Sequence, residues 1–297
     1  MDKSSEMAVF VEVARKGSFS AAARRLQLSP SAVSKLVTRM EERLGSRLFN
    51  RTTRKLSLTE GGQRYFGRCV EILADIDAAE ELLAGYQHAP KGELIVSCSP
   101  GFARFQLLPL VPRFLQQHPE LELNLQTAGE KVDLLSHNID VAIRLGNLKD
   151  STLVARKLGE SYRVVCASPE YLAVHGTPKR PGDLVSHNCL TIATEKEFNR
   201  WTLTRGKNQQ VVDVSGNLVS NSVDSMYEMA LQGLGIINLA EFIVGGDLRS
   251  GRLVPLLKNY KSDSQLIHAV YPHRRHLPAK VRVFIDFLLA EFGDQVS

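Results

Sequence analysis

The tight turn at residues 27–30 constrains the fold of this chain more than any other feature. Ser29 followed by Pro30 is a strong helix start, because serine can cap a helix N-terminus and proline suits the first helical position. Residues 18–26 predict a short helix that begins at the N-cap Ser18 and contains three alanines, which let another helix pack closely. The sequence therefore predicts two helices joined by a short turn.

A longer helix is predicted from Pro30 to Leu44, and Gly45 marks its end. Its apolar stripe consists of Val33, Val37, Met40 and Leu44. Another face is polar near its N-terminal half and consists of Ser31, Ser34, Lys35 and Thr38. Hydroxyls can bond base edges and lysine can reach guanine or phosphate, so this face is typical of a helix that reads the major groove. The alternative is a small helical bundle with a polar surface.

A basic turn follows this helix. Residues 47–49 and 56–58 are short strand-like runs on either side of Asn-Arg-Thr-Thr-Arg-Lys at 50–55. Cations at the tip of a hairpin cannot serve a core, but they can neutralise phosphates or enter a minor groove. The first 68 residues also hold 14 Lys/Arg and 6 Asp/Glu, whereas the rest hold 23 and 26. These features weaken the bundle alternative and predict a winged helix-turn-helix that binds double-stranded DNA.

The N-terminal residues closely resemble the start of LysR-type transcriptional regulators. The matching stretches are 10–26, 29–35, 44–54 and 58–62, and Asn50 departs from the family, which often carries an acid there. The resemblance implies a winged helix-turn-helix domain over 1–59, with 29–39 facing the major groove and 51–55 forming the wing contacts. The candidate DNA-binding residues are Ser18, Ser20, Ser29, Pro30, Ser31, Ser34, Lys35, Thr38, Arg39, Arg51, Thr52, Thr53, Arg54 and Lys55.

A long helix is predicted from about residue 60 to 87, within a linker of residues 60–91. Apolar residues recur along it at alternating intervals of four and three, at Tyr65, Cys69, Ile72, Ile76, Ala79, Leu83 and Tyr86. This spacing predicts a coiled-coil seam, and the alternative is a helix that packs on its own domain. The family resemblance implies that this linker helix dimerises the protein and that the full-length protein is a tetramer.

The remaining residues, 92–297, alternate between strand and helix patterns and predict an α/β effector-binding domain of two lobes. We expect a strand at 94–98, a helix from about 104 to 117, a strand at 121–126, a helix at 132–136 and a helix at 222–232. This part also resembles the LysR-type effector domain, which is similar to periplasmic binding proteins. Lobe I is expected to comprise 92–161 and 266–297, and lobe II 162–265.

Candidate effector-binding residues lie where predicted strands meet helices. Ser97, Ser99 and Phe102 flank the first helix start, whose free N–H groups suit an anion. Arg144 ends an apolar strand and could supply a cation, while Asn221 and Ser222 precede a helix of the other lobe. The alternative roles are ordinary helix capping for the serines and a surface ion pair for Arg144. Thr127 and Asn238 are weaker candidates. Together these residues predict a small, anionic effector.

Other chemistry is not indicated by the sequence. The four cysteines, Cys69, Cys98, Cys166 and Cys189, are widely spaced, so no metal site or disulfide framework is predicted and a reducing cytoplasm fits best. We expect no cofactor, no catalytic activity and no membrane span. RNA polymerase is a candidate further partner. Two other functions stay open: a redox-responsive LysR-type regulator, and an α/β ligand-binding protein whose N-terminal segment binds protein.

Overall fold

The computed structural model describes residues 3–51, 56–84, 89–127, 134, 139–146, 148, 153–193, 196–272 and 277–293. Contacts between residues divide the chain into two compact units, the first containing the chain up to Pro90 together with the described residues 134 and 277–282, and the second containing the remaining described residues from Lys91 on. Within the described residues, none of the helices has the length and apolarity needed to span a bilayer.

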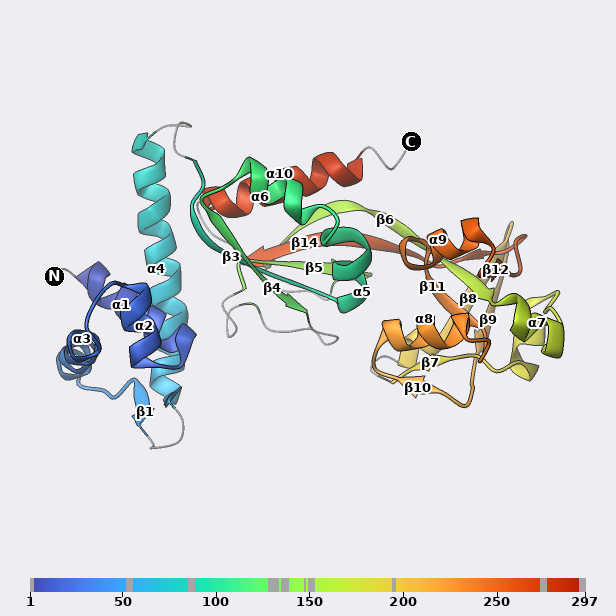
Figure 1. Ribbon diagram of the computed structural model, residues 1–297, viewed down its shortest axis with the longest axis horizontal. Helices are drawn as coiled ribbons and strands as arrows, with labels where there is room; N and C mark the ends of the chain where they lie inside the picture. The colour runs from blue at the N-terminus through green and yellow to red at the C-terminus, as the bar shows by residue number, and fades with distance from the viewer. Residues whose placement is uncertain are drawn as a thin grey trace. The chain divides into compact units, whose positions relative to one another are not determined.

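The first unit is a helix-turn-helix followed by a β-hairpin and a long helix (Figure 1). Its elements are α1 (Lys3–Lys16), α2 (Phe19–Arg25), α3 (Pro30–Leu44), β1 (Phe49–Arg51), β2 (Leu56–Leu58) and α4 (Glu60–Ala84). The strands β1 and β2 pair antiparallel, with Phe49 opposite Leu58. The winged helix-turn-helix predicted from the sequence is therefore confirmed.

The core of this unit forms around Phe10 of α1. Its ring lies 5.4 Å from the ring of Phe49 and 6.2 Å from that of Phe66, so α1, the wing and α4 share one apolar cluster. Three of the four residues predicted for the apolar stripe of α3 are fully buried in this cluster, namely Val33, Val37 and Met40. The fourth, Leu44, is 36% exposed because it is the last residue of the helix, so the buried part of the stripe ends at Met40.

The first part of α4 packs on its own domain. Cys69 is fully buried in the cluster around Phe10, and Tyr65 packs against the same cluster with its ring 5.6 Å from that of Phe10. These two positions therefore belong to the fold of one chain, and assigning them to an intermolecular seam was wrong. Ile72 is 42% exposed and Ile76 is half-buried, so the part of the seam that a partner could cover begins at Ile72. Residues 85–88, which include Tyr86, lie outside the described residues.

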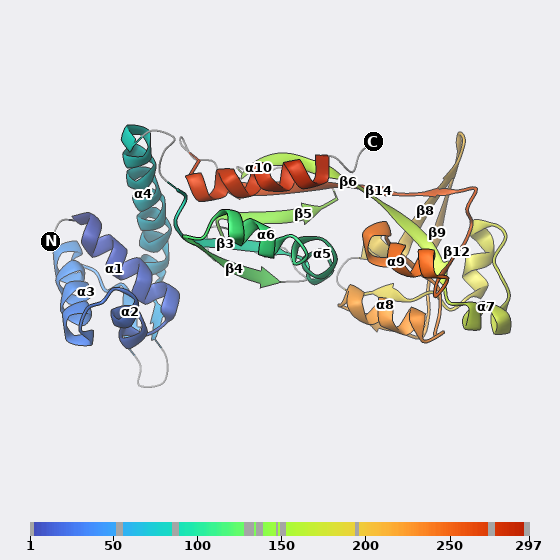
Figure 2. The same ribbon diagram turned by 45° about the horizontal axis from the view of Figure 1, so that its top comes forward.

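The second unit is built on one sheet that runs through both lobes. Its strands are β3 (Gly92–Cys98), β4 (Leu121–Thr127), β5 (Val141–Leu145), β6 (Leu153–Ala167), β14 (Ser264–Pro272), β11 (Ile237–Ala240) and the short β12 (Val254–Pro255). Their order is β11-β6-β14-β5-β3-β4, with β12 beside β6. Figure 2 shows the antiparallel pair β6 and β14 passing from one lobe to the other. We call the half with β3, β4 and β5 lobe I and the half with β11 and β12 lobe II.

The helices of lobe I are α5 (Pro100–Phe102), a π-helical turn (Ala103–Leu107), α6 (Val111–Gln117) and α10 (Ala279–Gly293). The single helix predicted over 104–117 is wrong, because Pro109 has no N–H to donate and the chain breaks before α6. The ring of Phe114 on α6 lies 5.3 Å from that of Phe284 on α10, so these two helices pack side by side. The helix predicted at 132–136 lies outside the described residues except for Leu134.

Lobe II contains α7 (Pro169–His175), α8 (Val223–Leu231) and α9 (Glu241–Ser250). A second sheet has the order β13 (Lys261–Ser262), β8 (Arg200–Arg205), β9 (Asn208–Asp213), and a small parallel pair joins β7 (Thr191–Ile192) to β10 (Val219–Ser220). Short 3-10 turns cover Pro181–Ser186 and Lys196–Asn199. Trp201 and Tyr171 are among the largest fully buried side chains in this lobe, so β8 and α7 share its core.

Candidate functional site

The turn between α2 and α3 is held by its own side chains. The Ser18 hydroxyl accepts a hydrogen bond from the Ala21 amide at 3.3 Å, and the Ser29 hydroxyl accepts one from the Ala32 amide at 3.2 Å. Gln27 adopts a left-handed conformation with φ of 54°, which reverses the chain after α2. Ser18 and Ser29 therefore act as helix caps. Their contribution to DNA recognition is indirect, because they fix the position of α3.

The polar face of α3 turns away from the apolar core. Ser31, Lys35 and Arg39 are exposed and recur every four residues, so they lie along one side of the helix. Ser34 and Thr38 are half-buried beside them, Pro30 is exposed at the helix start, and Ser20 is exposed on α2. This side of α3 offers hydroxyls and two cations, which are the groups that bond base edges and phosphates.

The base of the wing is tied to both neighbouring helices. One carboxylate oxygen of Glu41 on α3 accepts hydrogen bonds from the amides of Leu48 at 2.8 Å and Phe49 at 3.2 Å. A side chain at Gly62 on α4 would place its Cβ 2.1 Å from the Leu48 carbonyl oxygen, so only glycine fits there. The wing is thus fixed relative to α3. Arg51 ends β1, and Thr52, Thr53, Arg54 and Lys55 lie outside the described residues.

An ion pair not predicted from the sequence joins α1 to α3. Arg43 donates to a carboxylate oxygen of the buried Glu6 at 2.8 Å, and this hydrogen bond raises the pKa of the Arg43 guanidinium. Glu6 is the acidic residue in the first turn of α1, and nothing in the sequence pattern showed which cation it would meet.

In lobe I, three polar residues share one face of the sheet, which we call the Ser97 face. Ser97 on β3 pairs with Ala142 on β5, and Arg144, two residues further along β5, pairs with His268 on β14. Paired residues and residues two apart project from the same side of a sheet. Ser97, Arg144 and His268 therefore form one polar surface.

The Ser97 face contains buried polar atoms with unused bonding capacity. Ser97 is 1% exposed, and among the described residues neither its hydroxyl nor the Nδ1 atom of His268 has a hydrogen-bond partner. Burial lowers the pKa of the Arg144 guanidinium and that of the His268 imidazole. Buried polar groups in native proteins are nearly always bonded, so two such atoms on one face indicate a site for a polar ligand or water. The sequence reasoning missed His268, which only the strand register reveals.

Three further candidates lie where the lobes meet. Ser99 caps α5 by accepting a hydrogen bond from the Phe102 amide at 3.4 Å. Ser222 occupies the N-cap position of α8 but makes no side-chain cap bond, and Asn221 before it is exposed. The starts of α5 and α8 are adjacent, because a Cβ at Gly101 would lie 3.9 Å from Val223. These residues are therefore available at the junction of the lobes, although α5 is too short to carry a large dipole.

Three predicted effector residues are not brought to the Ser97 face. Phe102 is buried among aromatic rings, with those of Phe242 and Phe292 each 5.9 Å away, so it packs in the core instead of forming an exposed wall. The amide group of the buried Asn238 exchanges hydrogen bonds with the Ser262 hydroxyl at 3.0 and 3.1 Å. Thr127 pairs with Cys98, the residue after Ser97 on β3. Because neighbouring residues of a strand project to opposite faces, Thr127 lies on the other side of the sheet from Ser97.

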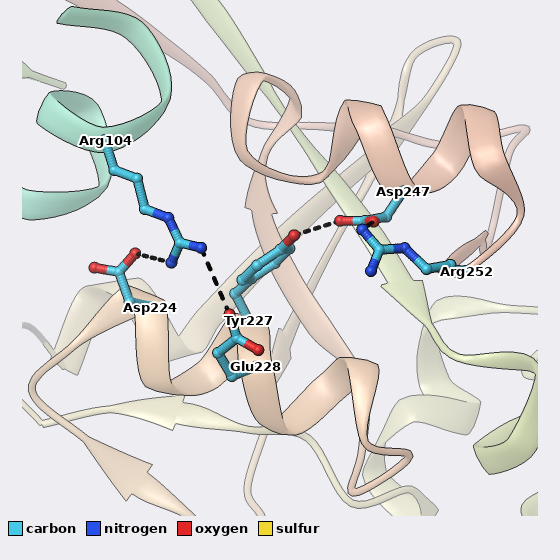
Figure 3. Close-up of polar contacts among 6 residues, drawn as sticks. All are labelled: Arg104, Asp224, Tyr227, Glu228, Asp247 and Arg252. Carbon is cyan, nitrogen blue, oxygen red and sulfur yellow. Dashed lines mark hydrogen bonds and ion pairs between the residues drawn. The ribbon is translucent and has the colours of Figure 1, made fainter. Parts of the chain in front are cut away.

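An ionic contact joins lobe I to lobe II (Figure 3). The guanidinium of Arg104, in the π-helical turn, lies 3.5 Å from the carboxylate of Asp224 and 3.7 Å from that of Glu228, both on α8. It also lies 5.9 Å from the centre of the Tyr227 ring. The sequence carried no signal for this contact, because it depends on how the two lobes pack.

Tyr227 links this contact to the buried carboxylate of Asp247. The Tyr227 hydroxyl donates to Asp247 at 2.5 Å, and Arg252 forms an ion pair with the same side chain. Burial, followed by the hydrogen bond to Asp247, raises the pKa of Tyr227 to about 12. Asp247 thus accepts from Tyr227 through one oxygen, pairs with Arg252 through the other, and joins α8 to α9.

The cysteines are free and buried. Burial raises the pKa of Cys69 to about 11 and that of Cys98, Cys166 and Cys189 to about 12. The thiolate is the reactive form, so these environments are typical of structural cysteines and not of a redox sensor. In the part of the chain that the structure describes, no cluster of three His, Cys, Asp or Glu is placed to hold a metal ion.

Two family models match the chain. The model of the bacterial regulatory helix-turn-helix protein of the lysR family matches residues 4–63, and the model of the LysR substrate binding domain matches residues 87–293. Among curated relatives, the regulator CrgA of Neisseria meningitidis serogroup B is 38% identical and covers 99% of this chain and 98% of its own. The activator AaeR of Escherichia coli is 35% identical over 98% of this chain and 94% of its own.

Solved structures agree. Full-length CrgA superposes with a TM-score of 0.66 at 38% identity, covering 99% of this chain and all of that one. Full-length AphB of Vibrio cholerae, described as a virulence activator, superposes with a TM-score of 0.62 at 27% identity, covering 98% of this chain. The helix pair, the wing and the two-lobed second unit thus occur together in known regulators. This chain belongs to the LysR family of bacterial transcriptional regulators, with a helix-turn-helix DNA-binding domain and an effector-binding domain.

Proposed function

We propose that this regulator reads its operator through α3 and the wing and responds to a small carboxylate held on the Ser97 face. The observation that carries the effector part is the pair of buried polar atoms without partners, the Ser97 hydroxyl and the His268 Nδ1, beside the half-buried Arg144. A hydroxyl, a guanidinium and an imidazole together match the bonding pattern of a carboxylate.

On the DNA side, we assign base contacts to the exposed side of α3. Ser31, Lys35 and Arg39, with Ser34 and Thr38 beside them, supply groups that bond base edges. Arg51 and residues 52–55 of the wing are assigned phosphate contacts, which add affinity for any sequence. Ser18 and Ser29 contribute through capping, because their hydroxyls are already bonded to helix amides.

On the effector side, lobe II completes the proposed site. Asn221 and Ser222 precede α8, whose start lies against α5, and the Ser222 hydroxyl makes no cap bond. A ligand bonded both to the Ser97 face and to these residues would favour one arrangement of the lobes, and differential affinity of this kind is what shifts an equilibrium between conformations.

The proposed assembly is a dimer through α4 that pairs into a tetramer through the effector domains, which is the assembly that the family resemblance implies. Ile72 and Ile76 are the side chains of α4 that a second copy would cover. We also propose that the protein works in the cytoplasm, that it contacts RNA polymerase at its promoters and that it catalyses no reaction.

The test of the proposed effector site uses the full-length protein and DNA from upstream of its own gene. Small carboxylates and their neutral amide analogues are screened for an altered footprint, and active carboxylates are repeated on Arg144→Gln and Ser97→Ala. We expect carboxylates but not amides to act, and both variants to lose the response while keeping ligand-free DNA binding. Equal activity of the amides, or a normal response in Arg144→Gln, contradicts the assignment.

The DNA assignment is tested separately with Lys35→Ala and, as the control, Arg64→Ala. Arg64 is an exposed cation on α4 that pairs with Glu60. Loss of a base contact at Lys35 should cost roughly 1–3 kcal/mol of binding free energy. The control should bind as the unchanged protein does, and equal binding by both variants would remove Lys35 from the interface.

A further inference from the structure

Lobe II contains a hollow of about 450 Å³ that the proposed function does not use. It lies between the lobe II end of β6 and the segment from β12 to β13, and none of the residues assigned to the effector lines it. Two of its lining residues contact the sequence candidate Asn238, because the Ser262 hydroxyl bonds the Asn238 side chain and Val165 pairs with Asn238 in the sheet. A volume of this size is in the range of small-molecule sites.

The floor of the hollow is apolar and tied to both sheets of the lobe. Val165, Leu203 and Leu256 line it and are buried. The Leu256 amide donates to the Val165 carbonyl at 2.8 Å, and Leu203 on β8 pairs with Ser262 on β13. The floor therefore keeps its shape without a ligand.

One residue of the floor has an unusual backbone conformation. Leu257 has a φ of 50°, a left-handed value that bulky side chains rarely adopt, and its carbonyl accepts a hydrogen bond from the Tyr260 amide at 2.8 Å. Such strain persists only where the surrounding structure imposes it, and it recurs at binding sites. The conformation places the Leu257 side chain, which is 8% exposed, in the lining of the hollow.

The rim is cationic and aromatic. Lys258, Lys261 and Arg163 line the hollow and none of the described carboxylates does, while Tyr162 is 58% exposed at its edge. Within the described residues, neither lysine forms an ion pair, whereas the Arg163 guanidinium lies 3.8 Å from the centre of the Phe198 ring. The ammonium groups of Lys258 and Lys261 are thus available to a ligand that packs on the apolar floor of the hollow.

We propose that this hollow is a second ligand site, which takes a small aromatic carboxylate. The ring of the ligand packs on Val165, Leu203 and Leu257, and its carboxylate binds Lys258 and Lys261. Apolar burial supplies affinity, and the paired charges select the anion over a neutral analogue of the same shape. This site is separate from the Ser97 face, and the proposal does not depend on whether the Ser97 face binds an effector.

The test is calorimetric titration of the full-length protein with 1-naphthoate and with the neutral 1-naphthalenemethanol. Replacing both rim lysines, Lys258→Gln with Lys261→Gln, should raise the Kd for naphthoate about tenfold and leave that for the alcohol unchanged. Lys179→Gln with Lys207→Gln is the matched control, because both are exposed lysines of lobe II outside the hollow. This control should bind naphthoate as the unchanged protein does.

A second variant tests the floor without changing charge. Leu257→Gly accepts the left-handed backbone and removes the side chain, so it should weaken both ligands alike. The proposal is overturned if naphthoate does not bind, if its Kd is the same in the rim variant and the control, or if Arg144→Gln abolishes its binding. A lysine-dependent affinity for a hexaglutamate peptide with none for naphthoate would also overturn it, because the hollow would then be a protein docking surface.

Discussion

Removing the Arg104 guanidinium should loosen the two lobes of the effector domain. Arg104 belongs to lobe I, whereas Asp224, Glu228 and Tyr227 belong to α8 of lobe II (Figure 3). Arg104→Gln keeps much of the side-chain length but loses the charge. Other contacts between the lobes remain, such as the packing of Phe102 on Phe242, so the domain should stay folded.

The size of the effect follows from the exposure of these groups. The Arg104 side chain is 52% exposed and its partners Asp224 and Glu228 are 27% and 48% exposed, so solvent screens both ion pairs. Exposed pairs each contribute about 0.2–1 kcal/mol, and a cation over an aromatic ring at an exposed site adds about 0.5–1 kcal/mol. The contact should therefore favour the present arrangement of the lobes by roughly 1–3 kcal/mol, a factor of about 5–150 in its population.

The assay is a distance measurement between spin labels on Glu120→Cys in lobe I and Val174→Cys in lobe II. Both positions are exposed, and the native thiols are buried, so the labels go to the introduced cysteines. Labelled protein is diluted with an excess of unlabelled protein, so that only distances within one chain are seen. Arg104→Gln should broaden the distribution or shift it.

The control is Arg113→Gln. Arg113 forms an ion pair with Glu291 and lies over the Phe287 ring, so it makes the same kinds of contact as Arg104 but within lobe I. Its loss should leave the distance between the lobes unchanged. An unchanged distribution in Arg104→Gln, or an equal change in both variants, would refute the reasoning.

Four further predictions concern stability and reactivity. Gly62→Ala should destabilise the DNA-binding unit by about 1–3 kcal/mol in thermal unfolding, because its Cβ meets a backbone carbonyl at 2.1 Å, while Gly61→Ala should cost little because its nearest contact is 3.7 Å. Asp247→Ala should cost about 1–3 kcal/mol in denaturant unfolding, because it leaves the Tyr227 hydroxyl without its buried acceptor, whereas Arg252 is 65% exposed and stays solvated; an unchanged midpoint contradicts this. Because burial raises the pKa of Cys98 to about 12, the folded state keeps its proton above pH 9, so unfolding free energy should fall as pH rises from 9, and less steeply in Cys98→Ala. Native thiols should also resist Ellman's reagent until the protein unfolds.

Features fixed by neighbouring residues could be predicted from the sequence. The caps at Ser18 and Ser29, the stop at Gly45 and the paired strands of the wing all depend on a few consecutive residues, and the structure contains each of them. Leu44 and Cys69 show the limit of periodicity. A regular spacing identifies one face of a helix, but it does not say whether that face meets its own domain or a partner.

Features that depend on long-range packing could not be predicted. The ion pair of Glu6 with Arg43 joins residues 37 positions apart, and the contact of Arg104 with Asp224 joins residues 120 apart. Phe102 was assigned to a pocket because it follows a strand, yet its ring is buried against Phe242, which no local pattern could show.

The Ser97 face illustrates why strand register decides the site. His268 reaches this face because β14 pairs with β5 so that His268 lies opposite Arg144. On its other edge β14 pairs with β6, where the register shifts between Ile267 and His268 and β6 carries an extra residue, Leu158. A slip of one residue would turn His268 to the opposite side of the sheet. The extra residue on β6 lets β6 and β14 stay paired along the segment that joins the lobes while His268 remains opposite Arg144. The strands that connect the lobes therefore also position His268, a residue of the proposed effector site. An effector bonded to His268 would therefore contact one of the strands that connect the two lobes directly.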